Sequence, residues 1–287
     1  MVLPATALPR PAHHYRPPNV LQDIRLLDLL ELCGTTVQAS RLLHVSQPTI
    51  SRRYRNLAKD FSLVRNRRQL WGCGYGTSAA MRLLRLGCRA HRLAAGVARI
   101  GSDLLHHPLL DSCTWLLPSP QRFRAAAHWL ELVRQGVLDG ALLSGLELEE
   151  APEVNCQELE LLPLGELPLA LVGEGPEVLV PNQAVAPGLR RLLQELGLPL
   201  RSGGNSLQTP DDWIKRIQGS ALALVVADCQ ADTWACLRRS PLHPGHLARP
   251  VRSPVWLALP GDWQEQPLLR HTARELSRMD GSQQLKA

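Results

Sequence analysis

The sequence predicts an α/β protein in two parts: an N-terminal winged helix-turn-helix with a linker helix, and a larger α/β domain. Residues 35–61 have the pattern of two short helices joined by a tight turn. Beyond residue 99, short apolar runs alternate with helical patterns, which is typical of a mainly parallel sheet covered on both faces. The chain has 287 residues, of which 45% are hydrophobic, so it can bury the cores of two domains.

Composition sets the expected domain boundaries. Residues 1–19 are rich in proline and lack the apolar run of a signal peptide, so we expect a disordered tail there. We expect the winged helix-turn-helix at residues 20–76, a linker and dimerisation helix at 77–98, and an α/β domain of regulatory type at 99–287. No stretch approaches the ~18 uncharged apolar residues that a membrane span needs.

Charge is divided unevenly along the chain. Residues 1–100 hold 16 Lys and Arg against 4 Asp and Glu, whereas residues 101–287 hold 16 against 22. A basic third joined to a mildly acidic remainder predicts one module for a polyanion and another for a different partner. Neutralising phosphates is the usual use of such charge, and the alternative is that basic surface only confers solubility.

The first domain carries helix start and stop signals in the expected order. Asp23 can cap a helix at about residues 24–33, and Gly34 can end it. Thr35 or Thr36 can cap a second helix that ends at residue 43. Residues 44–45 then form the turn, and Ser46 caps a third helix, whose first turn tolerates Pro48.

The third helix has two distinct faces. Its apolar face consists of Ile50, Tyr54, Leu57 and Phe61. Its opposite face consists of Pro48, Arg52, Arg55 and Lys59, flanked by Gln47 and Ser51. Such a helix can pack on its own domain and still present donors to a DNA groove.

Several side chains in this helix suit base and phosphate recognition. Gln47 can pair with adenine through two hydrogen bonds, and Arg52 can do the same with guanine or hold a phosphate. Thr49 and Ser51 can contact either bases or backbone. The sequence therefore predicts a double-stranded DNA interface centred on the third helix.

A small β wing is expected after this helix. Residues 63–65 and 69–71 have the pattern of two short strands, with Asn66, Arg67 and Arg68 at the tip between them. The arginines at such a tip can reach phosphates or the adjacent minor groove. The alternative is an ordinary solvated hairpin.

The linker helix expected at about residues 77–98 carries two stripes. The basic stripe consists of Arg82, Arg85, Arg89, Arg92 and Arg99, and the apolar stripe of Met81, Leu84, Cys88 and Ala95. We expect the basic stripe to be a solvated face, with a second DNA contact as the alternative. A long helix with one apolar seam is suited to dimerisation.

The run from Ala39 to Leu57 resembles the DNA-binding helices of the LysR-type transcriptional regulators. The small residue at 39, the Leu-x-Val-Ser-Gln-Pro turn and the Ser-Arg pair all stand in family positions. The resemblance implies that Gln47, Pro48, Ser51 and Arg52 lie next to bases. It also implies supporting contacts from Ser46, Thr49 and Arg55. The wing departs from the family pattern on both sides of its tip.

The same resemblance implies that the second domain has two α/β subdomains, similar to periplasmic solute-binding proteins, with an effector cleft between them. Expected strands are 97–102, 112–117, 136–143, 167–172, 178–180, 198–201, 221–226 and 255–259, and expected helices are 120–135, 187–196, 210–218 and 265–279. Only about ten residues separate the first two strands, so the first subdomain is expected to be shortened.

Two serines at strand ends are candidates for the effector cleft. Hydroxyl groups such as those of Ser102 and Ser119 can help to hold a small anion near helix N-termini. The alternative for each serine is a plain capping role. Asp139 lies in residues 136–143, which resemble a segment that leads into a strand in the family. A structural and a functional role for Asp139 are both open.

Catalytic, metal and cofactor sites have no support in the sequence. The chain has no HExxH, CxxC or GxSxG motif, and its glycine-rich stretch at residues 72–76 lacks a phosphate-loop lysine. Seven cysteines without close pairing motifs favour a reducing cytoplasm. Cys229 and Cys236 allow a redox switch, with inert buried thiols as the alternative.

Together these features predict a cytoplasmic, sequence-specific transcriptional regulator that binds DNA as a dimer or a dimer of dimers. A small-molecule effector and RNA polymerase are the further partners that such a role implies. The competing hypothesis is that the α/β domain is a ligand-independent platform for oligomerisation or protein interaction. An enzyme on the same fold is a third possibility, disfavoured by the missing catalytic groups.

Overall fold

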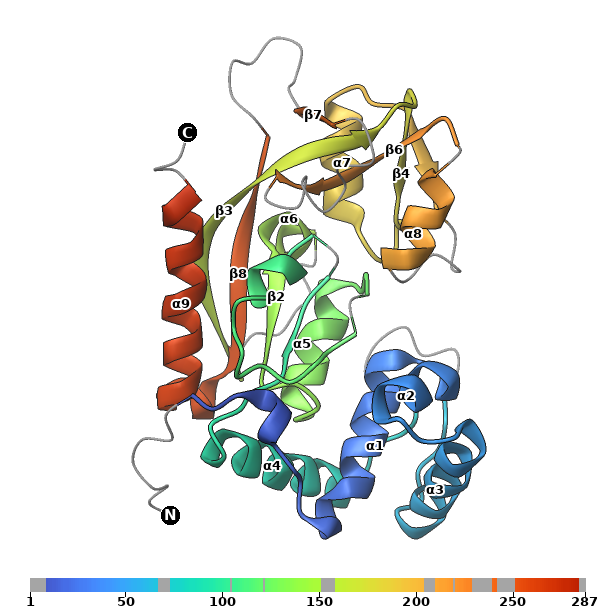
Figure 1. Ribbon diagram of the computed structural model, residues 1–287, viewed down its shortest axis with the longest axis vertical. Helices are drawn as coiled ribbons and strands as arrows, with labels where there is room; N and C mark the ends of the chain where they lie inside the picture. Colours follow the sequence, from blue (N-terminus) through green and yellow to red (C-terminus); the bar gives the residue numbers. More distant parts are fainter. Residues whose placement is uncertain are drawn as a thin grey trace.

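The computed structural model describes residues 9–66, 73–103, 105–120, 122–150, 158–203, 210–218, 220–228, 239–241 and 251–283. A small helical domain lies beside one end of a larger α/β domain, and helix α4 (Ala79–Ala94) runs beneath the larger domain and ends beside α1 (Figure 1). Arg67, Arg68 and the second strand of the expected wing lie outside the described residues.

Three helices form the helix-turn-helix domain: α1 (Asn19–Cys33), α2 (Thr36–Leu43) and α3 (Gln47–Asp60). Their shared core includes Leu27, Leu30, Ala39, Ile50 and Leu57. Gly34 ends α1 in the left-handed conformation at φ 71°, and the Thr35 hydroxyl accepts from Gln38 N at 3.2 Å, as their residue types predict. Asp23 does not cap α1, which begins earlier. Its carboxylate accepts instead from Arg53 Nε at 2.6 Å.

The segment before α1 differs from the prediction of a disordered tail. Residues 12–14 form a 3₁₀ turn, and Ala12 and Tyr15 pack against Val97 and Leu117 of the larger domain. Ala12 N donates to Thr114 O at 2.8 Å. Composition alone did not predict that this segment is ordered, because the segment has few apolar groups of its own. It is held by packing against the surface of the rest of the chain. Residues 1–8 lie outside the described part of the chain.

Eight strands within the described ranges form one mixed sheet in the order β1-β2-β8-β3-β6-β4-β5, with β7 paired to β3. Their bounds are β1 (Ile100–Gly101), β2 (Gly140–Ser144), β3 (Leu159–Gly173), β4 (Glu177–Val180), β5 (Leu200–Ser202), β6 (Leu222–Ala227), β7 (Arg239–Pro241) and β8 (Arg252–Pro260). The expectation of a mainly parallel sheet is wrong. The long strands β3 and β8 run antiparallel to their neighbours, because they carry the chain between two subdomains.

Helices cover the two subdomains separately. The first subdomain contains α5 (Ala126–Arg134), the short α6 (Gly145–Glu149) and the C-terminal α9 (Pro267–Gln283), which flanks β3 and β8 (Figure 1). The second contains α7 (Pro187–Glu195) and α8 (Pro210–Ile217). In α8, Trp213 is fully buried against β6 and its neighbours. Helices α7, α8 and α9 lie close to the positions that the sequence predicted, whereas α5 begins six residues later than the predicted helix at 120–135 and α6 was not predicted.

The first subdomain is shortened where the sequence predicted it. Among the described residues between β1 and Leu116, the chain forms only a 3₁₀ turn at His107–Leu110. The second expected strand is reduced to an isolated parallel bridge between Ala98 and Leu116. Too few residues are present here for an ordinary crossover helix. In the described part of the chain, no helix is long and apolar enough to cross a membrane.

Candidate nucleic-acid interface

Helix α3 lies at the outer edge of the molecule, away from the sheet (Figure 1). Ile50 and Leu57 are buried in the domain core, and Tyr54 is half-buried, with its hydroxyl donating to Tyr75 O at 3.0 Å. Arg52, Arg55 and Lys59 are exposed on the other side. This confirms the predicted orientation of the helix, in which the apolar face packs inward and the basic face meets solvent.

The N-terminal turn of α3 is organised by side-chain hydrogen bonds. Gln47 Nε2 donates to Thr36 Oγ1 at 3.0 Å and lies 3.4 Å from Ser51 Oγ. Ser46 stands at the N-cap position, but its hydroxyl pairs with that of Thr49 at 2.8 Å rather than with the backbone. Gln47 and Pro48 are exposed. The polar groups of this turn are therefore both positioned and open to solvent.

The basic side chains of α3 differ in their partners. Arg52 and Arg55 have no acidic partner among the described residues, and Arg55 Nε reaches only Ser51 O at 3.4 Å. Arg53, one position away, is paired with Asp23 at the side of the domain. Two uncompensated guanidinium groups thus share the exposed face of α3, where they can meet phosphates or base edges.

The prediction of a first wing strand at residues 63–65 is wrong. Residues 63–66 form no strand, and Asn66 N donates to Gly74 O at 2.9 Å across the start of the loop. The Arg65 guanidinium lies over the Tyr75 ring at 4.4 Å from its centroid and donates to the Tyr75 hydroxyl. Arg65 is therefore held by the domain itself, and contacts from Arg67 and Arg68 remain predictions.

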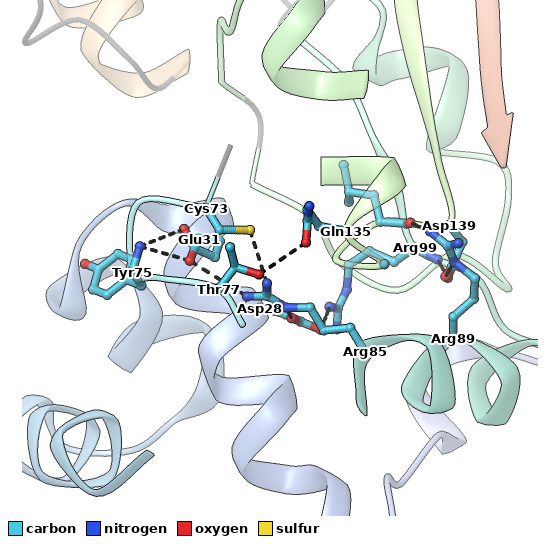
Figure 2. Close-up of polar contacts among 12 residues, drawn as sticks. Asp28, Glu31, Cys73, Tyr75, Thr77, Arg85, Arg89, Arg99, Gln135 and Asp139 are labelled. Atoms are coloured by element: carbon cyan, nitrogen blue, oxygen red, sulfur yellow. Dashed lines mark hydrogen bonds and ion pairs between the residues drawn. The ribbon is translucent and has the colours of Figure 1, made fainter. Parts of the chain in front are cut away.

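The expectation that the arginine stripe of the linker helix is solvated is wrong for four of its five members. Helix α4 (Ala79–Ala94) is shorter than expected, and Arg85, Arg89, Arg92 and the following Arg99 are all buried. Arg82 alone of the five is exposed, and it pairs with Glu158. The fold brings acidic residues from distant segments onto this stripe, so it faces the protein (Figure 2).

Two buried carboxylates anchor the stripe. Asp28 of α1 accepts from Arg85 Nε at 2.9 Å. Asp139, just before β2, accepts from Arg92 Nη2 at 2.6 Å and from the Arg99 backbone N–H at 2.7 Å. Although burial alone would raise the pKa of Asp139, the Arg92 guanidinium holds that pKa below its ordinary value. Asp139 is therefore a structural residue that joins α4 to the first subdomain.

For Arg89 and Glu31 of the same cluster, burial has a larger effect on the pKa than the neighbouring charges have. It lowers the pKa of Arg89 to about 10, although Asp139 opposes the shift. It also raises the pKa of Glu31 to about 7, although Arg85 lies nearby and both carboxylate oxygens accept from Tyr75 N. Glu31 thus stands at the junction of α1, the loop at Tyr75 and α4, with a pKa near neutrality (Figure 2).

We expect Glu31→Gln to flatten the pH dependence of stability. Because the folded state raises the pKa from 4.5 to about 7, it binds the proton more tightly than the unfolded chain does. The resulting stabilisation is fully present below pH 4.5 and is lost as pH rises to about 7, an effect of roughly 2–3 kcal/mol. Urea unfolding at pH 5 and pH 8 measures it. Equal losses in the wild type and the variant would contradict the expectation.

The candidate effector residues occupy different environments. Ser102 is buried, donates to Asp103 O at 3.1 Å and lies 3.3 Å from His107 Nδ1. The Ser119 hydroxyl is buried without a hydrogen-bond partner among the described residues. Neither serine lines the cavity between the subdomains. An effector-binding role for Ser102 and Ser119 therefore stays a prediction.

The cavity between the subdomains is very small. Its free volume is about 10 Å³, roughly the space of one water molecule, and Asp103, Arg124, Ser144 and Glu147 contribute polar groups to its lining. Glu147 of α6 accepts from Gly188 N and Leu189 N, at the N-terminus of α7 in the opposite subdomain. Burial raises the pKa of Glu147 to about 7. A carboxylate of the chain itself thus occupies the anion-binding end of α7.

The described cysteines have the surroundings of inert thiols. Cys33, Cys73, Cys88 and Cys113 are buried and unpaired, and burial raises the thiol pKa values to between about 11 and 12. Cys229 and Cys236 lie outside the described residues, so the redox hypothesis for that pair stays open. Among the described residues, no cluster of potential ligands could hold a metal ion.

No protein-family model and no curated protein matches the chain. Among solved structures, it resembles full-length CbnR, a LysR family transcriptional regulator, in complex with its target DNA. The identity is 16%, the TM-score is 0.50, and the match covers 91% of this chain and 99% of CbnR. HinK from Pseudomonas aeruginosa is 18% identical over 92% and 99% of the two chains, with a TM-score of 0.44. ArgP from Mycobacterium tuberculosis is 17% identical over 91% and 97%, with a TM-score of 0.46.

The likeness to CbnR establishes the architecture of the chain. The match extends over the helix-turn-helix, the linker helix and the two-subdomain α/β domain, and it leaves almost none of CbnR uncovered. The chain therefore shares the overall fold of CbnR, with a shortened first crossover in its α/β domain.

Proposed function

We propose that this protein is a sequence-specific DNA-binding transcriptional regulator in which α3 reads the major groove. The observation that carries the proposal is the exposed basic face of α3, where Arg52 and Arg55 have no acidic partner among the described residues. A domain that buries one face of a helix and leaves two guanidinium groups on the other has a ready docking surface for a duplex. The likeness to a LysR-type regulator in complex with DNA supports it.

The residues of the first turn of α3 have distinct roles in this proposal. Gln47 and Arg52 would read base edges, since their side chains can form paired hydrogen bonds to adenine and guanine. Arg55 would hold a phosphate. Ser46, Thr49 and Ser51 would contact backbone or bases, while Pro48 sets the path of the first turn.

Selection of bound fragments from a random duplex pool tests the proposal. The purified chain should enrich one motif made of two related half-sites, separated by about one helical turn or a multiple of it. Binding should also weaken steeply with salt, because each neutralised phosphate releases counterions. A pool that stays random through repeated rounds in low-salt buffer would refute sequence-specific binding.

We further propose that two copies of the chain pair through α4, although not through the predicted seam. Met81 and Cys88 of that seam are buried in the chain's own core. A different apolar line is open: Ala80, Leu83, Gly87, Ala90 and Ala94 recur at intervals of three and four residues. Leu83 is 69% exposed, and a Cβ placed on Gly87 would meet open space. This spacing allows a second α4 to approach closely.

We expect Leu83→Asp to weaken the dimer at least tenfold, because it would place a charge in the middle of this seam. Sedimentation equilibrium of the full chain measures the change. Val20→Asp is the matched control, since Val20 is also an exposed apolar residue, at 82%, but lies on α1. Equal effects of the two changes would place the dimer interface elsewhere.

We also propose that a small-molecule effector and RNA polymerase are partners of this protein. An effector would have to enlarge the small cavity between the subdomains. It would also have to compete with Glu147 for the N-terminus of α7. The proposal assigns the chain a binding role rather than catalysis, and places it in the cytoplasm with its target DNA.

A further inference from the structure

The C-terminal end of α1 is completed by the regulatory domain. An α-helix leaves its last four carbonyl groups without partners inside the helix. In α1 the first of these, Leu30 O, accepts from Gly34 N at 2.8 Å. The other three accept from arginines beyond residue 120: Arg124 Nη2 donates to Glu31 O and Leu32 O, and Arg122 Nη1 donates to Cys33 O.

This arrangement is both electrostatic and steric. Two guanidinium groups lie at the negative end of the α1 dipole, where positive charge is most favourable. A Cβ on Gly34 would meet the guanidinium end of Arg122, and the positive φ of 71° independently favours glycine at this turn. The helix-turn-helix therefore fits closely against the segment that carries these arginines.

Phe123, which lies between the two arginines, contacts the second subdomain. The Phe123 ring meets the Trp213 ring of α8 edge-on, with centroids 5.5 Å apart, and packs against the core of the second subdomain. Phe123 and Arg124 also line the cavity between the subdomains. Residues 122–124 thus touch the helix-turn-helix, the second subdomain and the cavity at once.

We propose that residues 122–124, the Arg-Phe-Arg segment, couple the closure of the two regulatory subdomains to the position of the DNA-binding helices. When the second subdomain moves away, Trp213 either leaves Phe123 or draws it along. In both cases Arg122 and Arg124 shift relative to α1. The inference rests on the proposed DNA-binding function, and it adds a path within one protomer that does not pass through α4.

A substitution of Glu147 can weaken the contact between the two subdomains without changing residues 122–124. Its carboxylate joins α6 of the first subdomain to the N-terminus of α7 in the second. Glu147→Ala leaves Gly188 N and Leu189 N without that acceptor and should favour opening. A coupling of ordinary size would then change the Kd for a bound duplex about fivefold or more.

The test is a double-mutant cycle in the full chain, read by fluorescence anisotropy on a DNA fragment that the protein selects. Glu147→Ala should change the Kd about fivefold in the native background and less than twofold in Arg122→Gln/Arg124→Gln. Arg201→Gln/Arg270→Gln is the matched background. It also removes two arginines of the regulatory domain, which pair with Glu177 and Glu265 instead of α1. The fivefold effect should persist there.

Amide hydrogen exchange gives a second readout that needs no DNA. Glu147→Ala should speed exchange in residues 30–43 when the Arg-Phe-Arg segment is intact and leave it unchanged when both arginines are replaced. Equal effects of Glu147→Ala in all backgrounds, or none in any, would overturn the coupling. A chain that binds no DNA but shows the exchange pattern would refute only the proposed function. Thermal unfolding of each variant confirms that it is folded.

Discussion

Asp139→Ala is expected to destabilise the protein by about 3–5 kcal/mol, the largest single effect that we anticipate. The change would leave Arg92 and Arg89 buried at the junction of α4 and the first subdomain without their carboxylate. Removing one partner of a buried ion pair costs this much because the remaining charge cannot recover its hydration. It would also remove the acceptor of the Arg99 backbone N–H. Urea unfolding at pH 7 measures the loss.

Two comparisons separate charge burial from simple loss of contact. Glu158→Ala, which breaks the exposed pair with Arg82, should cost less than about 1 kcal/mol. Asp139→Leu combined with Arg92→Met should recover part of the loss, since an apolar pair carries no desolvation penalty. Equal costs for Asp139→Ala and Glu158→Ala would mean that water reaches the arginines.

The arginine stripe shows what periodicity alone cannot decide. The spacing of Arg85, Arg89 and Arg92 identifies one face of a helix, and that much was predicted correctly. Whether the face meets water depends on partners 57 and 47 residues away, at Asp28 and Asp139. No local pattern announces those partners. Only the tertiary fold turns an apparently solvated stripe into an internal ion-pair network.

This network changes the interpretation of the charge distribution. Of the 16 Lys and Arg in residues 1–100, Arg85, Arg89, Arg92 and Arg99 are buried and lie among carboxylates. The net charge of the N-terminal third therefore overstates the positive field that a duplex would meet. The field available to DNA comes mainly from α3 and its surroundings, where Arg52 and Arg55 are exposed.

The elements of the second domain were predictable where short loops separate strong patterns. Helix α7 and strand β4 lie within one residue of their expected positions, because Pro187 and the apolar run at residues 178–180 mark them locally. The cavity was not predictable. Glu147 and the adjacent pair Phe123 and Arg124 come from two distant segments that carry no motif, so only the folded chain shows that they meet. Ser102 and Ser119 were predicted only from their positions at strand ends, and neither residue lines the cavity.

The second large effect is expected at the interface itself: Arg52→Ala should weaken specific DNA binding by about 1–3 kcal/mol. Its guanidinium is exposed on the first half of α3 and has no acidic partner among the described residues, so it is free to form paired hydrogen bonds with a base. Competition between the selected fragment and random duplex separates base contacts from phosphate contacts. A base contact is lost only on the selected fragment.

Arg53→Ala is the matched control, because Arg53 is the adjacent arginine on the same helix but is paired with Asp23 at the side of the domain. It should leave the preference for the selected fragment unchanged. Gln47→Ala should reduce that preference in the same sense as Arg52→Ala, since both side chains lie on the exposed N-terminal half of α3. If Arg53→Ala cost as much as Arg52→Ala, α3 would have to meet DNA with its other edge. Equal losses from Arg52→Ala on selected and random duplex would instead assign Arg52 to a phosphate.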